Sequence, residues 1–208
     1  MEHTTLPDIS TPARGLEELA SRILIWAGIL LLGGGAGSVG LALTTEGGLH
    51  RLAETYLVSF AYFLSLALGA LFFVLLQHLT RAGWSVVVRR LAEAISANVI
   101  LMFVLVIPVI LNMEHLYHWA HHGAADHDPI IAGKSGFLNT EFFILRLVVY
   151  FAIWSVLAWY FFSSSKRQDG NGDPGITRKM EALSAPGMVV FALSINFAAF
   201  DLLMSVNP

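Results

Sequence analysis

The sequence predicts an all-α integral membrane protein with five transmembrane helices, one leading helix followed by a four-helix bundle. Of its 208 residues, 56% are hydrophobic and only 13% are charged, which is more apolar than an ordinary soluble domain. Five apolar stretches are each about 20 residues long, enough to cross the ~30 Å hydrocarbon layer of a bilayer. None of these stretches has an acid or a base in its middle third.

The expected spans lie near residues 23–43, 57–77, 91–111, 142–162 and 187–204. The tail over 1–22 is polar, so the first span is expected to be a retained helix rather than a cleaved signal peptide. A His-rich loop is expected over 112–141 and a polar loop over 163–186. Within Gly83–Arg90, an interfacial segment should turn Trp84 toward lipid and its arginines toward phosphate. Pro108 should kink the third span one turn before its outer end.

The basic residues predict the orientation. Nine of the 12 Lys and Arg lie in the tail and in the segments after spans two and four. By the positive-inside rule these parts are cytoplasmic, and the His-rich loop then faces the periplasm of a bacterial inner membrane. The chain has no cysteine and no basic block. We therefore expect no disulfide, iron–sulfur cluster, haem or metal in this chain, and no nucleic-acid partner.

Two short motifs have simpler interpretations than their patterns suggest. Residues 35–40 match the dinucleotide fingerprint Gly-x-Gly-x-x-Gly, but they lie inside an apolar span with no preceding strand. Small residues at this spacing favour close helix packing in lipid. Residues 169–173 begin like a calcium loop, but Pro174 occupies the position that needs glycine. We expect a solvated turn there.

The histidine run after the third span leaves metal chemistry open. His118-x-x-His121-His122 resembles one box of a membrane di-iron enzyme, but such enzymes need several boxes and this chain has one. A haem held by two histidines is disfavoured because His78 and His115 fall at opposite ends of their spans. Surface zinc or copper binding by His115, His118 and His122 remains open, although hydrogen-bonded or solvated imidazoles are favoured.

Ionisable groups gather at the expected outer face, where they are costly unless paired and mark ion, proton or substrate sites. These groups are Glu114, His115, His118, His121, His122, Asp126, His127, Asp128, Glu141, Arg146 and Asp201, joined by Tyr56 and His50 from the expected first outer loop. A histidine–carboxylate pair suits quinol oxidation, because imidazole accepts a phenolic proton near neutral pH and a carboxylate orients the ring. The candidate catalytic residues are His115, His118 and Asp201. Tyr56, Glu114, Glu141 and Arg146 are the candidates that support the site.

Four segments carry a resemblance to a known family. They are residues 56–90, HLYHW at 115–119, QDGNGD at 168–173 and FAAFDLLMS at 197–205, and QHLTRAGW at 77–84 is the most specific part. Together they resemble the second quinone-binding-type membrane subunit of alternative complex III, a bacterial quinol:cytochrome c (or high-potential acceptor) oxidoreductase. Its large membrane subunits belong to the polysulfide-reductase anchor superfamily. Members are about twice this long, with a second four-helix bundle, so the resemblance covers their N-terminal half.

The resemblance implies oxidation of menaquinol or ubiquinol on the periplasmic side. Electrons would pass to an iron–sulfur subunit and a multihaem cytochrome c, beside a related membrane subunit. It also implies a proton route through the bundle, with His78, Glu93 and Asn98 as inner-half candidates. Two alternatives stay open. The chain could be a non-catalytic anchor or proton-conducting subunit of the same complex, or an independent metal- or haem-binding membrane protein.

Overall fold

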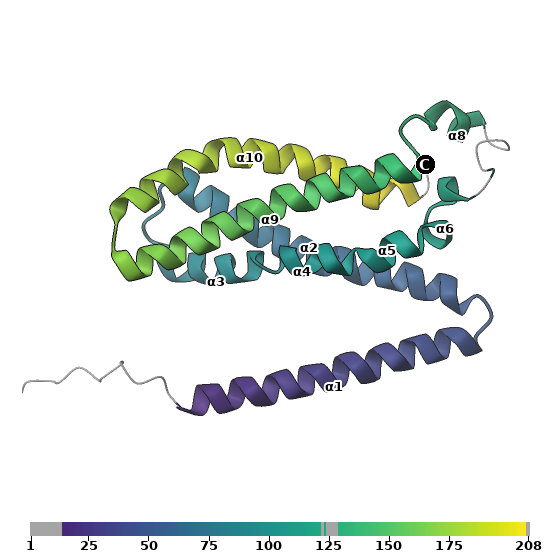
Figure 1. Cartoon of the computed structure of the whole chain (residues 1–208), viewed down its shortest axis with the longest axis horizontal. Coiled ribbons are helices and arrows are strands. Elements are labelled where there is room, and N and C mark those ends of the chain that lie inside the picture. Colours follow the sequence, from purple (N-terminus) through teal and green to yellow (C-terminus); the bar gives the residue numbers. More distant parts are fainter. Residues whose placement is uncertain (1–13, 122, 124–128, 207–208) are drawn as a thin grey trace, which may run out of the picture. The chain divides into compact units, whose positions relative to one another are not determined.

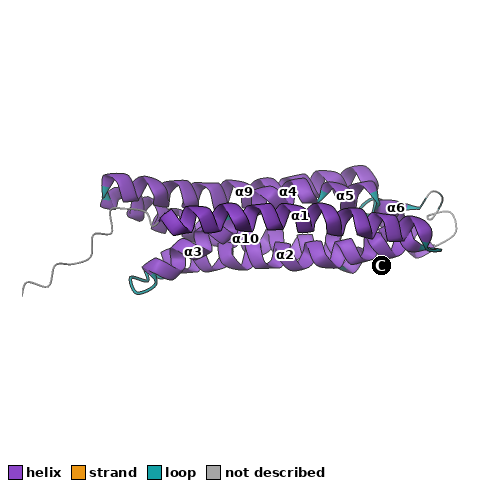
Figure 2. Ribbon diagram, turned by 90° about the horizontal axis from the view of Figure 1, so that it is seen from below, coloured by secondary structure: helices purple, strands orange, loops and turns teal. Residues whose placement is uncertain are grey.

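The predicted fold class is confirmed. A computed structural model describes residues 14–121, 123 and 129–206, and in this part of the chain all regular elements are helices (Figure 1, Figure 2). Among the described residues, five helices are long and apolar enough to cross a membrane. The chain is therefore a multi-pass membrane protein.

The chain divides into two compact units, Met1–Leu52 and Ala53–Pro208. The first contains α1 (Arg14–Thr44), which exposes leucines such as Leu24, Leu31 and Leu41. The turn from α1 into α2 (Gly48–Leu79) is tight, because a Cβ on Gly48 would lie 2.3 Å from the carbonyl oxygen of Ala42. Only glycine allows so close an approach of two backbone segments.

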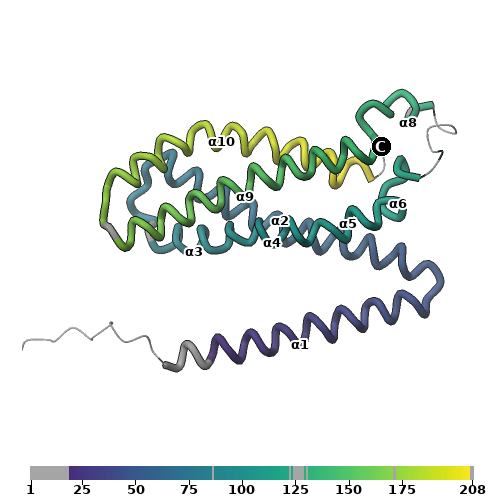
Figure 3. Tube along the Cα trace, in the orientation of Figure 1, coloured from purple at the N-terminus to yellow at the C-terminus, as the bar shows by residue number. Residues whose placement is uncertain are grey.

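The second unit is an antiparallel bundle (Figure 1, Figure 3), built from the four candidate spans that follow α1 in the described residues. The helices of these passes are the rest of α2, α3 (Val86–Ser96), α4 (Val99–Leu105), α5 (Ile107–Leu111), α9 (Thr140–Asn171) and α10 (Pro174–Leu202). Together α3, α4 and α5 make one pass. At one end, here called the histidine end, the described residues form four short helices: α6 (Met113–Leu116), η1 (His118–Ala120), α8 (Pro129–Lys134) and η2 (Met204–Val206). The opposite end, with the α9–α10 connection at Gly172, is called the turn end.

Large side chains fill the bundle interior. Leu71 and Leu75 of α2 and Phe151, Trp154 and Phe161 of α9 are all fully buried. The indole N–H of Trp154 donates to the Ser194 hydroxyl at 2.8 Å and so joins α9 to α10. The outward faces are apolar as well, so close packing and such polar bonds hold the helices together in lipid.

The third pass is interrupted twice, and a polar side chain meets the backbone near each interruption. At the first, the Asn98 side chain donates to the Ile95 carbonyl at 3.0 Å. The second is at Val106, two residues before Pro108, where the sequence predicts a kink. There the Tyr56 hydroxyl donates to the Leu105 carbonyl at 2.7 Å. Tyr56 thus belongs to α2 and not to a loop before it. Backbone groups at membrane depth need such partners because lipid supplies none.

The loop expected over 163–186 is instead helical almost throughout. α9 continues to Asn171, where Gly172 ends it with a left-handed φ of 61°. Asp173 then caps α10 by accepting from the Gly175 N–H at 2.7 Å, with Pro174 in the first turn. Residues 169–171 are therefore helical, and the turn is shorter than expected. Hydropathy marks where the hydrocarbon ends, whereas caps decide where a helix ends.

The close packing at Gly187 gives the first testable consequence. A Cβ at Gly187 would lie 3.2 Å from Leu75 and 3.3 Å from Leu157, so α10 meets α2 and α9 at this glycine. We expect Gly187→Leu to cost about 1–3 kcal/mol by overpacking, measured as unfolding by SDS in detergent micelles. Gly69→Leu is the matched control, because Gly69 of α2 has nothing within 4 Å of its Cβ position. Equal effects of the two changes would contradict this packing.

Candidate functional site

A buried ion pair joins α9 to α10 at the histidine end. Arg146 donates to Asp201 through Nε at 2.9 Å and Nη2 at 2.8 Å. The Tyr150 hydroxyl also donates to this carboxylate, at 2.9 Å. Arg146 Nη1 bonds the Phe137 carbonyl at 3.0 Å, and the guanidinium lies 3.9 Å from the centre of the Phe137 ring. Asp201 is fully buried, and its two carboxylate oxygens together accept three hydrogen bonds from Arg146 and Tyr150.

The histidine segment is anchored by its aromatic residues. The Tyr117 hydroxyl donates to the Leu202 carbonyl at 3.2 Å, and the Trp119 indole donates to the Ser205 carbonyl at 3.0 Å. Both side chains are buried. Burial, and then the nearby Asp201 carboxylate, raise the pKa of the Tyr117 hydroxyl above its usual range. The hydroxyl therefore stays protonated and keeps its role as a donor.

Because Tyr117 and Trp119 fill the interior, the histidines of this segment lie on the surface. His115, His118 and His121 are exposed, and the rings of His118 and His121 are 5.7 Å apart, centre to centre. No hydrogen bond or ion pair among the described residues joins His115 or His118 to Asp201. The structure thus pairs Asp201 with Arg146 and leaves the two candidate histidines apart from it.

The other outer-face candidates are dispersed. Glu114 on α6 and Glu141 on α9 are exposed. Glu141 lies in the first turn of α9, close to the capping residue Asn139. A carboxylate at this position interacts favourably with the helix dipole. Within the described ranges no group of three His, Asp or Glu could hold a metal ion. His122, Asp126, His127 and Asp128 lie outside those ranges.

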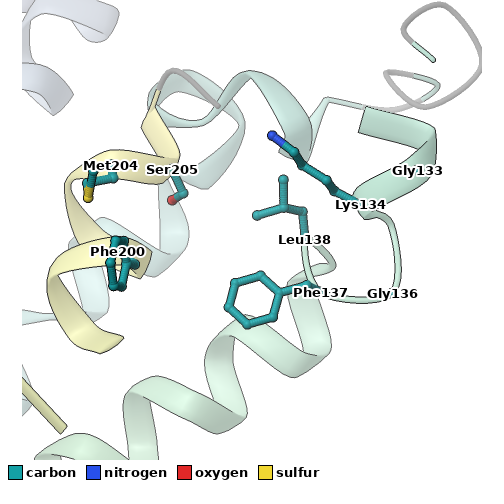
Figure 4. A pocket seen from close by; sticks show the side chains of 8 residues that line it. All are labelled: Gly133, Lys134, Gly136, Phe137, Leu138, Phe200, Met204 and Ser205. Atoms are coloured by element: carbon teal, nitrogen blue, oxygen red, sulfur yellow. The ribbon is translucent and has the colours of Figure 1, made fainter. Parts of the chain in front are cut away.

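A pocket of about 470 Å³ opens at the histidine end (Figure 4). Its lining residues are Gly133, Lys134, Gly136, Phe137, Leu138, Phe200, Met204 and Ser205. The pocket wall is coupled to the ion pair, since the Phe137 carbonyl accepts from Arg146 and the Ser205 hydroxyl donates to the Asp201 backbone carbonyl. One ammonium group among apolar side chains suits an amphiphilic ring or headgroup better than a polar metabolite.

A second polar cluster, the turn-end cluster, is formed by His78, Arg89, Arg90, Glu93, Ser165 and Asp169. His78 of α2 and Glu93 of α3 are each 1% exposed, and His78 Nε2 lies 4.0 Å from Glu93 Oε1. Arg89 Nε lies 3.8 Å from the same oxygen, and Arg90 Nη1 lies 3.4 Å from Oε2. His78 and Glu93, predicted proton-path residues, therefore meet. Asn98, the third, is exposed and serves the helix break instead.

Arg90 links Glu93 to the surface. Its guanidinium donates to the Ser165 hydroxyl at 2.5 Å and to the Ser165 carbonyl at 3.1 Å, and it pairs with Asp169, whose side chain is 65% exposed. Arg90 thus turns toward α9 and not toward phosphate as expected. The pairing of Arg90 with Glu93 could have been predicted from the sequence, because residues at i and i+3 share one helix face. Nothing in the sequence points to Ser165.

The turn-end cluster is incompletely hydrogen-bonded. Five buried side-chain atoms in the described part of the chain have no hydrogen-bond partner among its atoms, and four of them belong to this cluster: His78 Nδ1, His78 Nε2, Arg89 Nε and Glu93 Oε1. The fifth is Ser155 Oγ. A buried polar atom without a partner costs about 1–3 kcal/mol. Such a concentration of unpaired polar atoms in one place marks a candidate functional site.

Comparisons with known proteins do not assign the chain to a family. No protein-family model matches the chain, and no curated protein matches it significantly. The candidate site residues are therefore identified from their contacts alone. At the histidine end these contacts form a fully hydrogen-bonded ion pair. At the turn end they form a histidine–carboxylate pair without a direct hydrogen bond.

The Arg146–Asp201 pair predicts strong energetic coupling. Arg146→Leu or Asp201→Leu leaves a buried charge unpaired, so each change should cost about 3–5 kcal/mol, whereas the double change should cost far less than their sum. SDS unfolding of the four proteins measures this. The matched control is Arg81–Glu181, a pair at 3.3 Å in which Arg81 is 78% exposed, where glutamine substitutions should show a coupling of about 0–1 kcal/mol. Additive costs at Arg146 and Asp201 would refute the coupling.

Proposed function

We propose that this chain is a membrane subunit of a respiratory quinol:cytochrome c (or high-potential acceptor) oxidoreductase and that its own contribution is proton transfer. The resemblance in residues 56–90 and 197–205 supports the assembly. One observation carries the role: His78 and Glu93 are buried side by side in a membrane-spanning bundle, and both have atoms without partners. Ionisable groups are rarely retained at such positions without a function.

The chemistry of the pair suits a proton relay. A neutral imidazole accepts a proton at one ring nitrogen and releases one from the other, so it passes protons without changing place. Glu93 can deliver a proton from its carboxyl, and the 4.0 Å separation from His78 Nε2 is spanned by a single water. Arg90 keeps its own protons, but its bonds to Glu93 and to the exposed Asp169 place the cluster next to solvent at the turn end. A proton would therefore enter from the turn end and reach His78 through Glu93.

The charge distribution supports a cytoplasmic turn end in a bacterial inner membrane. Seven basic residues lie in the sequence around this end, namely Arg81, Arg89, Arg90, Lys166, Arg167, Arg178 and Lys179. The histidine end would then face the periplasm. There the exposed histidines would adjoin the partner subunits, an iron–sulfur subunit, a multihaem cytochrome c and a related membrane subunit.

Quinol oxidation within this chain is the second candidate function. The pocket beside Phe137 and Ser205 favours it, because its apolar wall suits a quinone ring and it adjoins the Asp201 pair. The oxygens of Asp201 are already engaged, since Arg146 and Tyr150 donate to its carboxylate. His115 and His118 would need a partner surface over them to act on quinol. These contacts favour proton transfer as the function of the chain.

Loss of the Glu93 carboxylate should distinguish proton transfer from quinol oxidation as the function of this chain. In vesicles of native membranes driven by a quinol, we expect Glu93→Gln to slow proton uptake by about tenfold or more, since an amide carries no exchangeable acid proton. Electron transfer with an uncoupler present should continue. Glu181→Gln is the control, because Glu181 also pairs with an arginine but lies outside the turn-end cluster.

The expected result requires equal amounts of both variants in the membrane. If Glu93→Gln left proton uptake at the wild-type rate, the chain would be a non-catalytic anchor. Stoichiometric iron or haem in the purified chain would instead support an independent metal- or haem-binding protein.

A further inference from the structure

We infer that the turn-end cluster is a water-binding site, in which at least one ordered water lies within hydrogen-bond reach of His78, Glu93 and Arg89. The three side chains converge without direct hydrogen bonds between these atoms. Glu93 Oε1 is 4.0 Å from His78 Nε2 and 3.8 Å from Arg89 Nε. Both separations are too long for a direct hydrogen bond, and a water oxygen about 2.8 Å from each partner spans them.

The donors and acceptors match a water molecule. Arg89 Nε offers a proton and Glu93 Oε1 offers lone pairs, while a neutral His78 offers one donor and one acceptor nitrogen. A water has two protons and two lone pairs, so it can accept from Arg89, donate to Glu93 and bond His78 as well. Buried waters typically make about three such bonds. All the atoms concerned are buried and lack a protein partner.

The charges around the site disfavour a metal cation, which would face the guanidinium groups of Arg89 and Arg90, both within 4 Å of the Glu93 carboxylate. A neutral molecule avoids this repulsion. The Phe161 ring borders the site, since its centroid lies 5.1 Å from that of the His78 ring.

Occupancy by water does not depend on quinol chemistry. Only the further step, in which this water passes the proton from Glu93 to His78, rests on the proposed function. That step breaks the O–H bond of a protonated Glu93 and forms an N–H bond on His78, while the water gives up one proton and takes another. No net charge is lost.

Radiolytic hydroxyl-radical labelling of the full-length chain in lipid nanodiscs tests the site, because bound water yields radicals that oxidise neighbouring side chains. The probe is water itself, supplied as heavy-oxygen water and followed by mass spectrometry. Phe161 and Phe151 are both fully buried rings of α9. We expect Phe161 and His78 to be oxidised faster than Phe151 in the wild-type chain. Equal labelling of Phe161 and Phe151 would overturn the water site.

A double variant, His78→Leu with Glu93→Leu, provides the matched comparison. It removes the polar atoms at similar volume, which is often neutral or stabilising when both partners are replaced. Labelling of Phe161 should fall to the level of Phe151, and persistent labelling would count against the site. If the double variant does not fold, the wild-type comparison decides alone. Fast labelling of Phe161 together with normal proton uptake in Glu93→Gln would overturn the relay and leave the water site standing.

Discussion

Each polar group inside this bundle needs a partner from the protein, because lipid offers none. Most interior groups obey this constraint. At the two interruptions of the third pass, the side chains of Tyr56 and Asn98 donate hydrogen bonds to backbone carbonyls. The Trp154 indole donates to the Ser194 hydroxyl between α9 and α10. The Arg146–Asp201 pair is the strongest instance, since two opposite charges are each bonded several times over. The exceptions are therefore informative, and the described residues concentrate them around His78 and Glu93.

The two ends of the bundle consequently have different characters. At the histidine end, Tyr117 and Trp119 seal the segment onto the end of α10, and Asp201 is fixed by Arg146. Such a completed network favours rigidity. At the turn end, Glu93 and His78 stay close without a direct bond, next to a chain of polar groups that reaches solvent at Asp169. An incomplete network of this kind suits a group that must exchange protons.

Hydropathy was enough to predict the fold, because five long apolar runs leave few alternatives in a bilayer. It could not predict where α9 ends, since polar residues up to Asn171 continue the helix until Gly172 and Asp173 stop it. Nor could it pair Arg146 with Asp201, which lie 55 residues apart on different helices. His115 and His118 lie in two short helical pieces that are too short to show a helical pattern of apolar residues. Their outward orientation is therefore seen only from the burial of Tyr117 and Trp119 in the structure.

We propose that the chain belongs to a quinol-oxidising assembly, whose turnover would drive the proton transfer through this chain. Mass spectrometry of the proteins that co-purify with the full chain, tagged at its N-terminus and taken from mildly solubilised native membranes, tests this claim most directly. We expect recovery of an iron–sulfur subunit, a multihaem cytochrome c and a related membrane subunit. Recovery of the chain alone, with bound metal or haem, would contradict the claim.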